Sequence, residues 1–154
     1  MPNRDKLPRG PFLEETVTVP VRFHEVDVMR VVWHGWYCAY FEDARVALGR
    51  RFGVSYEAIA GQGFMAPIVR LQCEFCAPAR YGDVLSVTAR LYPREAAKLE
   101  FGYLVHRSSD ARLLAIGQSL QVLTDMNGEL VLAQPQFLRD LRSQWASQVR
   151  SDEP

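Results

Sequence analysis

One long helical pattern interrupts a chain that otherwise alternates in the manner of β-strands. Within residues 35–52 the large apolar side chains recur at three- and four-residue spacing, which places them on one face of an α-helix. These positions are Tyr37, Tyr40, Phe41, Ala44, Leu48 and Phe52. The spacing predicts a helix from about Gly35 to Phe52, and Gly53 is suited to end it. So wide an apolar stripe must be buried against a large surface.

Strands are expected to supply that surface. Apolar and polar residues alternate in the segments 17–24, 65–76, 85–91, 99–106 and 114–122. The connections are short and polar, which favours antiparallel neighbours, and Asn127-Gly128 is a strong hairpin signal. Ser55 is suited to cap a short second helix, and Pro135 to begin a last one. We therefore predict an α+β fold: a curved antiparallel sheet of five to six strands wrapped around one long helix, plus a C-terminal helix.

The length of 154 residues fits one domain with a full core. We expect a flexible arm at residues 1–14, rich in proline and charge, a single domain at 15–146, and a polar tail at 147–154. The first ten residues lack the apolar core of a signal peptide, and no apolar run approaches the ~20 residues of a membrane span. Three cysteines, an odd number, favour a reducing compartment, so we expect a cytoplasmic protein.

Charge and cysteine spacing exclude several classes of function. Lys+Arg and Asp+Glu number 18 each, so the chain has no overall positive field for nucleic acid. A neutral chain with 11% aromatic residues favours self-association instead. Cys73 and Cys76 form a C-x-x-C, but in a strand these positions face opposite sides, and no second half-site completes four ligands, so we expect no metal. Neither a serine-hydrolase elbow nor a Gly-rich phosphate loop is present.

The candidate site lies where the first strand passes into the long helix. Asp27 is on the connecting loop, and the helix N-terminus that follows offers unpaired backbone N–H donors and a positive dipole. A carboxylate beside such donors suits acyl-group chemistry, in which negative charge develops on a carbonyl oxygen. Histidine is a common proton-transfer residue, so the side chain of His34 and its backbone amide are both candidates for a role. The tryptophan at position 33 could line an acyl or aryl pocket, or belong to the core or a subunit interface.

Other polar residues have simpler interpretations. Glu42 lies two turns into the predicted helix, where pairing with Arg45 is the simpler use of its carboxylate, although two-carboxylate sites do perform acid–base chemistry. His24 and His106 fall on the polar faces of strands, so we expect both at the surface.

The residues of this loop and helix carry a resemblance to a known family. D-V-M-R-V-V-W-H-G-W-Y at 27–37, Y-F-E-D-A-R at 40–45 and A-P-A-R-Y-G-D at 77–83 resemble the hotdog-fold acyl-CoA thioesterases of the 4-hydroxybenzoyl-CoA thioesterase and YbgC type. The resemblance extends over roughly residues 17–142. It implies a hotdog fold and hydrolysis of an acyl- or aryl-thioester to a free acid and a thiol. Asp27 then matches the catalytic carboxylate, as nucleophile or general base, and the helix N-terminus near His34 and Gly35 holds the oxyanion.

The same resemblance implies further roles. Ala66, Pro67 and Ile68 would line the substrate channel, and Arg94 and Lys98 would lie near the nucleotide of coenzyme A. Coenzyme A enters only as part of the substrate, with no metal or prosthetic group. Relatives place the site at a subunit interface, so a homodimer or, in preference, a homotetramer is expected.

Alternatives stay open at this point. The substrate could be a carrier-protein thioester, and a non-catalytic thioester-binding protein could share the fold; the pattern of hotdog hydratases is absent. One departure matters: Arg30 stands where relatives usually have Gly, so the loop could bend differently. A helix carboxylate serves some relatives in place of the loop aspartate, which keeps Glu42 as a second candidate.

Overall fold

The computed structural model describes residues 6–152. Five antiparallel strands form the sheet in the order β1-β4-β5-β6-β3. Their bounds are β1 Leu13–Pro20, β3 Ile68–Phe75, β4 Val84–Tyr92, β5 Lys98–Arg107 and β6 Leu113–Val122. A separate two-stranded ribbon pairs β2 (Phe64–Met65) with β7 (Thr124–Asp125). The predicted α+β architecture, with its antiparallel sheet and long helix, is confirmed.

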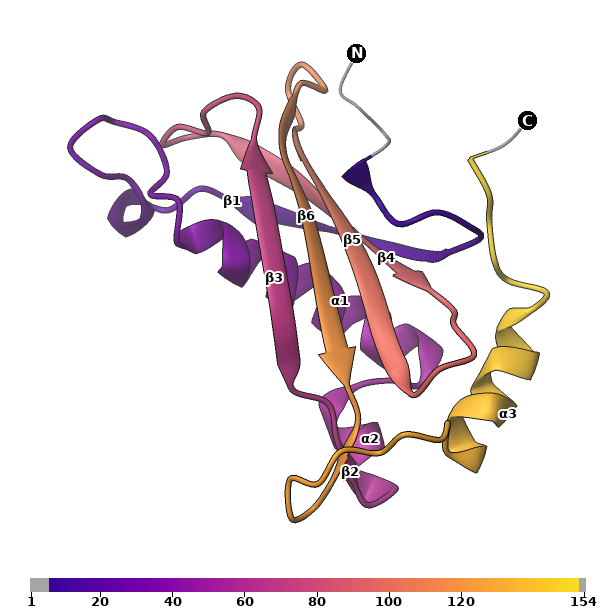
Figure 1. Cartoon of the computed structure of the whole chain (residues 1–154). Helices are drawn as coiled ribbons and strands as arrows, with labels where there is room; N and C mark the ends of the chain where they lie inside the picture. The colour runs from indigo at the N-terminus through magenta and orange to yellow at the C-terminus, as the bar shows by residue number, and fades with distance from the viewer. Residues whose placement is uncertain (1–5, 153–154) are drawn as a thin grey trace.

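The long helix α1 (Trp36–Phe52) lies along one face of the curved sheet (Figure 1). Its buried residues include the whole predicted stripe, and Gly53 ends it in a left-handed conformation with φ 84°. The closest approach is at Phe41, whose ring stacks on Tyr103 with centroids 4.5 Å apart. Gly117 of β6 makes room for that ring, because a Cβ there would lie 2.5 Å from it. The helix stripe and the inner face of the sheet therefore form one core.

Two short helices lie toward the C-terminal end of α1. In α2 (Tyr56–Gly61), Ser55 is the N-cap and its side chain accepts a hydrogen bond from the Ala58 amide, as predicted. In α3 (Gln136–Trp145), the indole of Trp145 donates to the Phe52 carbonyl at 3.0 Å, which fixes α3 to the end of α1. The loop that carries Asp27 lies at the opposite end of α1 (Figure 1).

The segments predicted as a loose arm and tail are in part packed on the sheet, which corrects that expectation. Leu7 and Phe12 are buried, and β1 already begins at Leu13. Leu7 covers Gly102 of β5, where an added Cβ would meet it at 2.8 Å. Phe12 and Arg150 exchange backbone hydrogen bonds of 2.9 and 2.8 Å, so the two terminal segments hold each other. Residues 1–5 and 153–154, which belong to the predicted arm and tail, lie outside the described residues.

The edge strand β3 is exposed on both faces. Its partner in the sheet is β6, and α1 covers little of it. Ile68, Val69, Leu71 and Phe75 are 38–57% exposed, while Cys73 packs against the core. An edge strand with this many exposed apolar side chains is a surface suited to pairing with another chain.

Candidate active site

The loop between β1 and α1 folds back on itself as a tight hairpin. Val26 and Val32 form an isolated antiparallel bridge. Inside it the Asp27 amide donates to the Val31 carbonyl at 3.0 Å, and the Arg30 amide donates to the Asp27 carbonyl at 2.9 Å. Arg30 has φ 62°, the left-handed conformation that glycine adopts most easily. The arginine therefore does not force a different bend; it takes the conformation a glycine would take.

A buried glutamate ties this hairpin to α1. The Glu25 side chain is 5% exposed, and its Oε1 accepts hydrogen bonds from the Arg22 amide at 2.7 Å and from the Tyr40 hydroxyl at 3.0 Å. The Glu25 carbonyl also accepts from the Trp33 amide at 2.9 Å. Burial, together with the Glu25 carboxylate, raises the pKa of Tyr40 above its ordinary value, so the phenol stays protonated and donates. Two of these hydrogen bonds brace the loop internally, and the one from Tyr40 holds it to α1.

Asp27 presents its carboxylate at the rim of a cavity of about 380 Å³. Its Oδ1 accepts from the Met29 amide at 2.8 Å, which orients the group within the turn. The cavity is mainly apolar, and its further lining includes Val32, His34, Tyr37, Phe75, Cys76 and Pro78. Burial raises the pKa of the Tyr37 phenol, so this neighbour is a neutral hydroxyl.

The helix N-terminus supplies donors beside this carboxylate. The Trp33 and Trp36 amides bond to the carbonyls of Glu25 and Trp33 respectively. The amides of His34 and Gly35 donate to no carbonyl in the described part of the chain. Together with the positive end of the helix dipole, they can stabilise an oxyanion. Gly35 is needed here, because a Cβ would lie 2.0 Å from the Trp33 ring.

A second cavity of about 380 Å³ begins at the same helix N-terminus and runs along α1. Trp33, Gly35 and Trp36 form one end, and Ile68 and Leu71 of β3 form its outer wall. Cys38, Ala39, Glu42 and Arg45 of α1 form its floor. We call this cavity the α1/β3 groove. No described residue lines both cavities, but residues 33–35 contribute to each of them: His34 lines the Asp27 cavity, and Trp33 and Gly35 line the groove.

The structure brings together most of the predicted site residues. Asp27, Trp33, His34 and Gly35 surround the helix N-terminus, and Ile68 lines the groove. Ala66 and Pro67 are placed otherwise: neither lines the groove, and their carbonyls accept structural hydrogen bonds from the Gln121 side chain and the Val122 amide.

Arg94 and Lys98 lie at the other end of the sheet from Asp27 within one chain. The strand register shows this, because β4 begins beside Pro20, near the Asp27 loop, and ends beside Leu13. Arg94 follows that far end and is bound by Glu100 at 2.6 Å. Lys98 begins β5 opposite Val122, again at the far end. One chain alone therefore does not place these cations at the candidate site.

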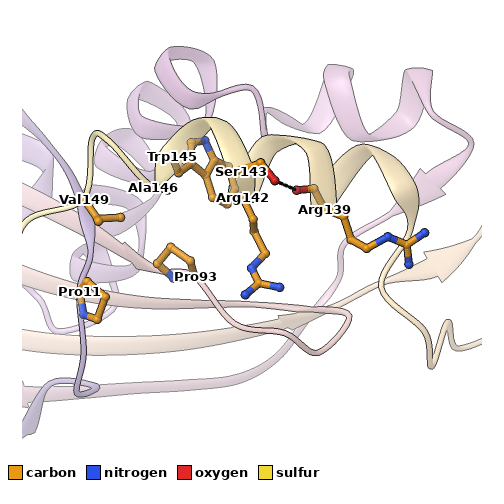
Figure 2. A pocket seen from close by; sticks show the side chains of 8 residues that line it. All are labelled: Pro11, Pro93, Arg139, Arg142, Ser143, Trp145, Ala146 and Val149. Carbon is orange, nitrogen blue, oxygen red and sulfur yellow. Dashed lines mark hydrogen bonds between the residues drawn. The ribbon is translucent and has the colours of Figure 1, made fainter.

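A cavity of about 490 Å³ lies at this far end, between α3 and the turn after β4 (Figure 2). Prolines 11 and 93, Trp145 and Val149 give it apolar walls. Arg142 points into the space and Arg139 away from it (Figure 2). Its lining includes neither a carboxylate nor a thiol. The one hydroxyl in its described lining, on Ser143, donates to the Arg139 carbonyl at 3.2 Å and has no histidine or carboxylate beside it there to act as a base, in contrast to the Asp27 end.

Several site residues escaped the sequence interpretation. The sequence indicated no role for Glu25 beyond its position two residues before Asp27. It predicted Tyr37 only as part of the helix stripe and Phe75 only as part of a strand. The predicted pairing of Glu42 with Arg45 is confirmed at 3.6 Å, but nothing in the sequence indicated that Arg45 is only 6% exposed. Within residues 6–152 no cluster of three or more His, Cys, Asp or Glu side chains could hold a metal ion. Over the same residues, no helix is long and apolar enough to cross a membrane.

Three known proteins are similar to this chain over 54–87% of its length. A solved structure of a hypothetical protein from Thermus thermophilus superposes with a TM-score of 0.73 at 34% identity, covering 84% of this chain and 97% of that one. DHNA-CoA thioesterase from Staphylococcus aureus superposes with a TM-score of 0.77 at 19% identity, covering 87% and 91%, which is a likeness of fold. Acyl-CoA thioester hydrolase YbgC of Escherichia coli is 28% identical over 83 residues, which are 54% of this chain and 62% of that protein.

The family model described as the Thioesterase-like superfamily matches residues 21–141. That range begins just before the Asp27 loop and ends within α3, so it contains the loop, α1 and the strands β3 to β6. With the match extending over most of the domain, the chain belongs to the Thioesterase-like superfamily.

Proposed function

We propose that this chain hydrolyses acyl-CoA thioesters at the N-terminus of α1. The observation that supports this most directly is the juxtaposition of the half-buried Asp27 carboxylate with two backbone amides that lack backbone acceptors. The thioester carbonyl oxygen points at the amides of His34 and Gly35, where negative charge is stabilised as it develops. Asp27 either attacks the carbonyl carbon, which breaks the C–S bond, releases the CoA thiolate and leaves a mixed anhydride for water to hydrolyse, or removes a proton from a water that attacks the carbon and displaces the same thiolate.

Residues 33–35 contribute to the lining of both cavities, and the two cavities suit the two halves of a thioester. The α1/β3 groove, with its indole and aliphatic walls, receives the acyl group. The Asp27 cavity receives the thiol side and water. Removing one oxyanion donor typically slows hydrolysis about 10²–10³-fold, so the geometry of the Gly35 region should be as important for rate as the carboxylate itself.

The catalytic assignment is tested by steady-state hydrolysis of a panel of short, long and aryl acyl-CoA esters, followed at the thioester absorbance. That readout avoids thiol dyes, which would also label the cysteines. We expect Asp27→Asn to abolish turnover while the protein stays folded. Asp43→Asn, an exposed carboxylate on α1, is the matched control and should leave turnover unchanged. Full activity in Asp27→Asn would refute the assignment and direct attention to Glu42. Turnover only with a carrier-protein thioester would place the enzyme in that substrate class.

We also propose that the working enzyme is a homodimer, or a homotetramer of such dimers, in the cytoplasm. The exposed apolar residues of β3 support the assembly, because the outer edge of this strand pairs with no other strand among residues 6–152 and the strand also walls the groove. Val69→Lys should lower the mass measured by light scattering and reduce activity, although Val69 lines neither cavity at the site. Leu132→Lys, at an exposed loop position, is the matched control. An assembly that Val69→Lys leaves intact would exclude β3 as the interface.

A further inference from the structure

The α1/β3 groove ends on a buried cation. Arg45 lies ten residues beyond Gly35, about 15 Å along the axis of α1 at ~1.5 Å per residue. Its Nη1 donates to the Tyr103 hydroxyl at 3.2 Å and its Nη2 to the Tyr56 hydroxyl at 2.9 Å. The side chain is thus fixed by two phenols, at the end of a groove whose lining, among the described residues, is mainly apolar and includes Glu42 as its other charged residue.

The charge of Arg45 is poorly neutralised within one chain. Its nearest carboxylate is Glu42, with Oε1 at 3.6 Å, and the Glu42 side chain is 56% exposed. Burial raises the pKa of Tyr103, so that partner is a neutral phenol, and its oxygen is shared with the Ser119 hydroxyl at 2.6 Å. The Arg45 Nε is buried and has no hydrogen-bond partner among the described residues. A buried guanidinium in this state favours a further acceptor.

Arg45 also separates two spaces. The groove lies on one side of it, and a smaller cavity of about 110 Å³ lies on the other, lined in part by Val54, Tyr56, Phe101 and Gln121. A methyl-terminated chain that reached Arg45 would cover the cation with hydrocarbon and give it no hydrogen bond. An acyl chain ending in a carboxylate would instead supply charge and acceptor oxygens to the guanidinium.

We propose that Arg45 determines acyl-group specificity, by terminating the groove and selecting acyl chains that carry a carboxylate at the far end. This inference rests on the proposed thioesterase function and on the groove as the acyl site. The substrate class is then the ω-carboxyacyl thioesters whose length spans the interval from the helix N-terminus to Arg45. Chains too short to reach Arg45 gain nothing from the carboxylate, and longer alkyl chains are blocked by the fixed side chain.

The test compares CoA esters in matched pairs of equal length, ending in a carboxylate or in a methyl group, with ω-hydroxyacyl esters as a third arm. For wild type we expect kcat/KM to favour the carboxylate member by about tenfold or more, at the lengths that reach Arg45. Arg45→Gln should reduce this ratio to near one, and Arg45→Lys should retain part of it. Arg51→Gln, on the same helix but paired with Glu15 outside the groove, is the matched control and should keep the full ratio.

The outcomes separate this inference from the proposed function. If hydrolysis depends on Asp27 but kcat/KM is the same for carboxylate- and methyl-terminated esters at every length, the specificity role of Arg45 is refuted and the catalytic proposal stands. If ω-hydroxyacyl esters are preferred over ω-carboxyacyl esters, the carboxylate is refuted as the group that Arg45 selects. If no CoA ester is hydrolysed, the catalytic proposal fails; calorimetric binding of thioether analogues of the same pairs then decides the specificity. Equal affinities of wild type for both members would refute the proposal, and so would a preference that persists in both Arg45→Gln and Arg45→Lys.

Discussion

The Glu25 carboxylate joins the catalytic loop to α1, and the consequences of removing it follow from its contacts. It is 5% exposed and accepts two hydrogen bonds, from the Arg22 amide and the Tyr40 hydroxyl. Glu25→Ala leaves both donors without an acceptor. A hydrogen bond to a charged group contributes about 1.5–3 kcal/mol, and the two share one oxygen, so we expect a loss of about 2–4 kcal/mol in the free energy of unfolding. Glu25→Gln keeps the shape but not the charge, and should cost about 1–2 kcal/mol.

Urea titration followed by tryptophan fluorescence measures these losses. A domain of this size has about 5–15 kcal/mol of stability, so both variants should remain folded. The melting temperature of Glu25→Ala should fall by about 4–16 °C, at roughly 2–4 °C per kcal/mol. A double-mutant cycle with Tyr40→Phe isolates the shared hydrogen bond, with an expected coupling of about 1–2 kcal/mol. Turnover should fall in Glu25→Gln even under conditions where the variant is fully folded, because Asp27 is then less firmly oriented against the helix N-terminus.

Two results would refute this reasoning. A Glu25→Ala variant within about 0.5 kcal/mol of wild type would mean that water or a shifted loop satisfies both donors at no cost. Zero coupling in the cycle, with each single substitution destabilising, would mean that Tyr40 contributes through packing and not through its hydroxyl.

Three further predictions concern the core, the thiols and pH. Gly117→Ala should destabilise the protein by about 1–3 kcal/mol in urea titrations, because the new Cβ would lie 2.5 Å from the Phe41 ring, and an unchanged midpoint would contradict that packing. Burial raises the pKa of the Cys73 thiol to about 12, so timed labelling of the native protein at pH 8 should find it slower to react than the two exposed thiols. Burial and the nearby Arg90 lower the pKa of His106, so the unfolded state takes up a proton that the folded state does not. Stability should therefore decline as pH falls below about 6.5, and His106→Gln should flatten that decline in thermal melts.

The parts of the fold that the sequence predicted are those determined by local patterns. The apolar stripe from Tyr37 to Phe52 has the period of a helix, and it is buried against the sheet without depending on the exact register of the strands. Gly53 and Ser55 act within one turn of their own positions, so helix ends were placed almost to the residue. Asp27 was located by its place before a helix, where backbone donors are guaranteed by helix geometry.

What the sequence could not predict depends on long-range contacts. Arg45 lies 58 residues from Tyr103, and nothing near either position indicates that the phenol holds the guanidinium. Leu7 and Phe12 lie in a stretch rich in proline and charge, yet Leu7 is buried over Gly102, and Phe12 packs against Tyr92 and Arg90. The resemblance placed Arg94 and Lys98 near coenzyme A, but the register of β4 and β5 puts them at the far end of the same chain, so that assignment requires a second subunit.

Arg30 shows how a residue that looks unsuitable can leave the site intact. A non-glycine residue in the left-handed region costs about 1–2 kcal/mol. Glycine at the same position would relieve that strain, but it would give the unfolded chain extra freedom that costs about 0.4–1 kcal/mol on folding. The second effect offsets about half of the first, so arginine in place of glycine costs the fold about 1 kcal/mol or less. The hydrogen bonds at Asp27 and Val31 fix the turn in either case, and the direction of the Asp27 carboxylate is therefore set by the backbone of the hairpin and not by the identity of residue 30.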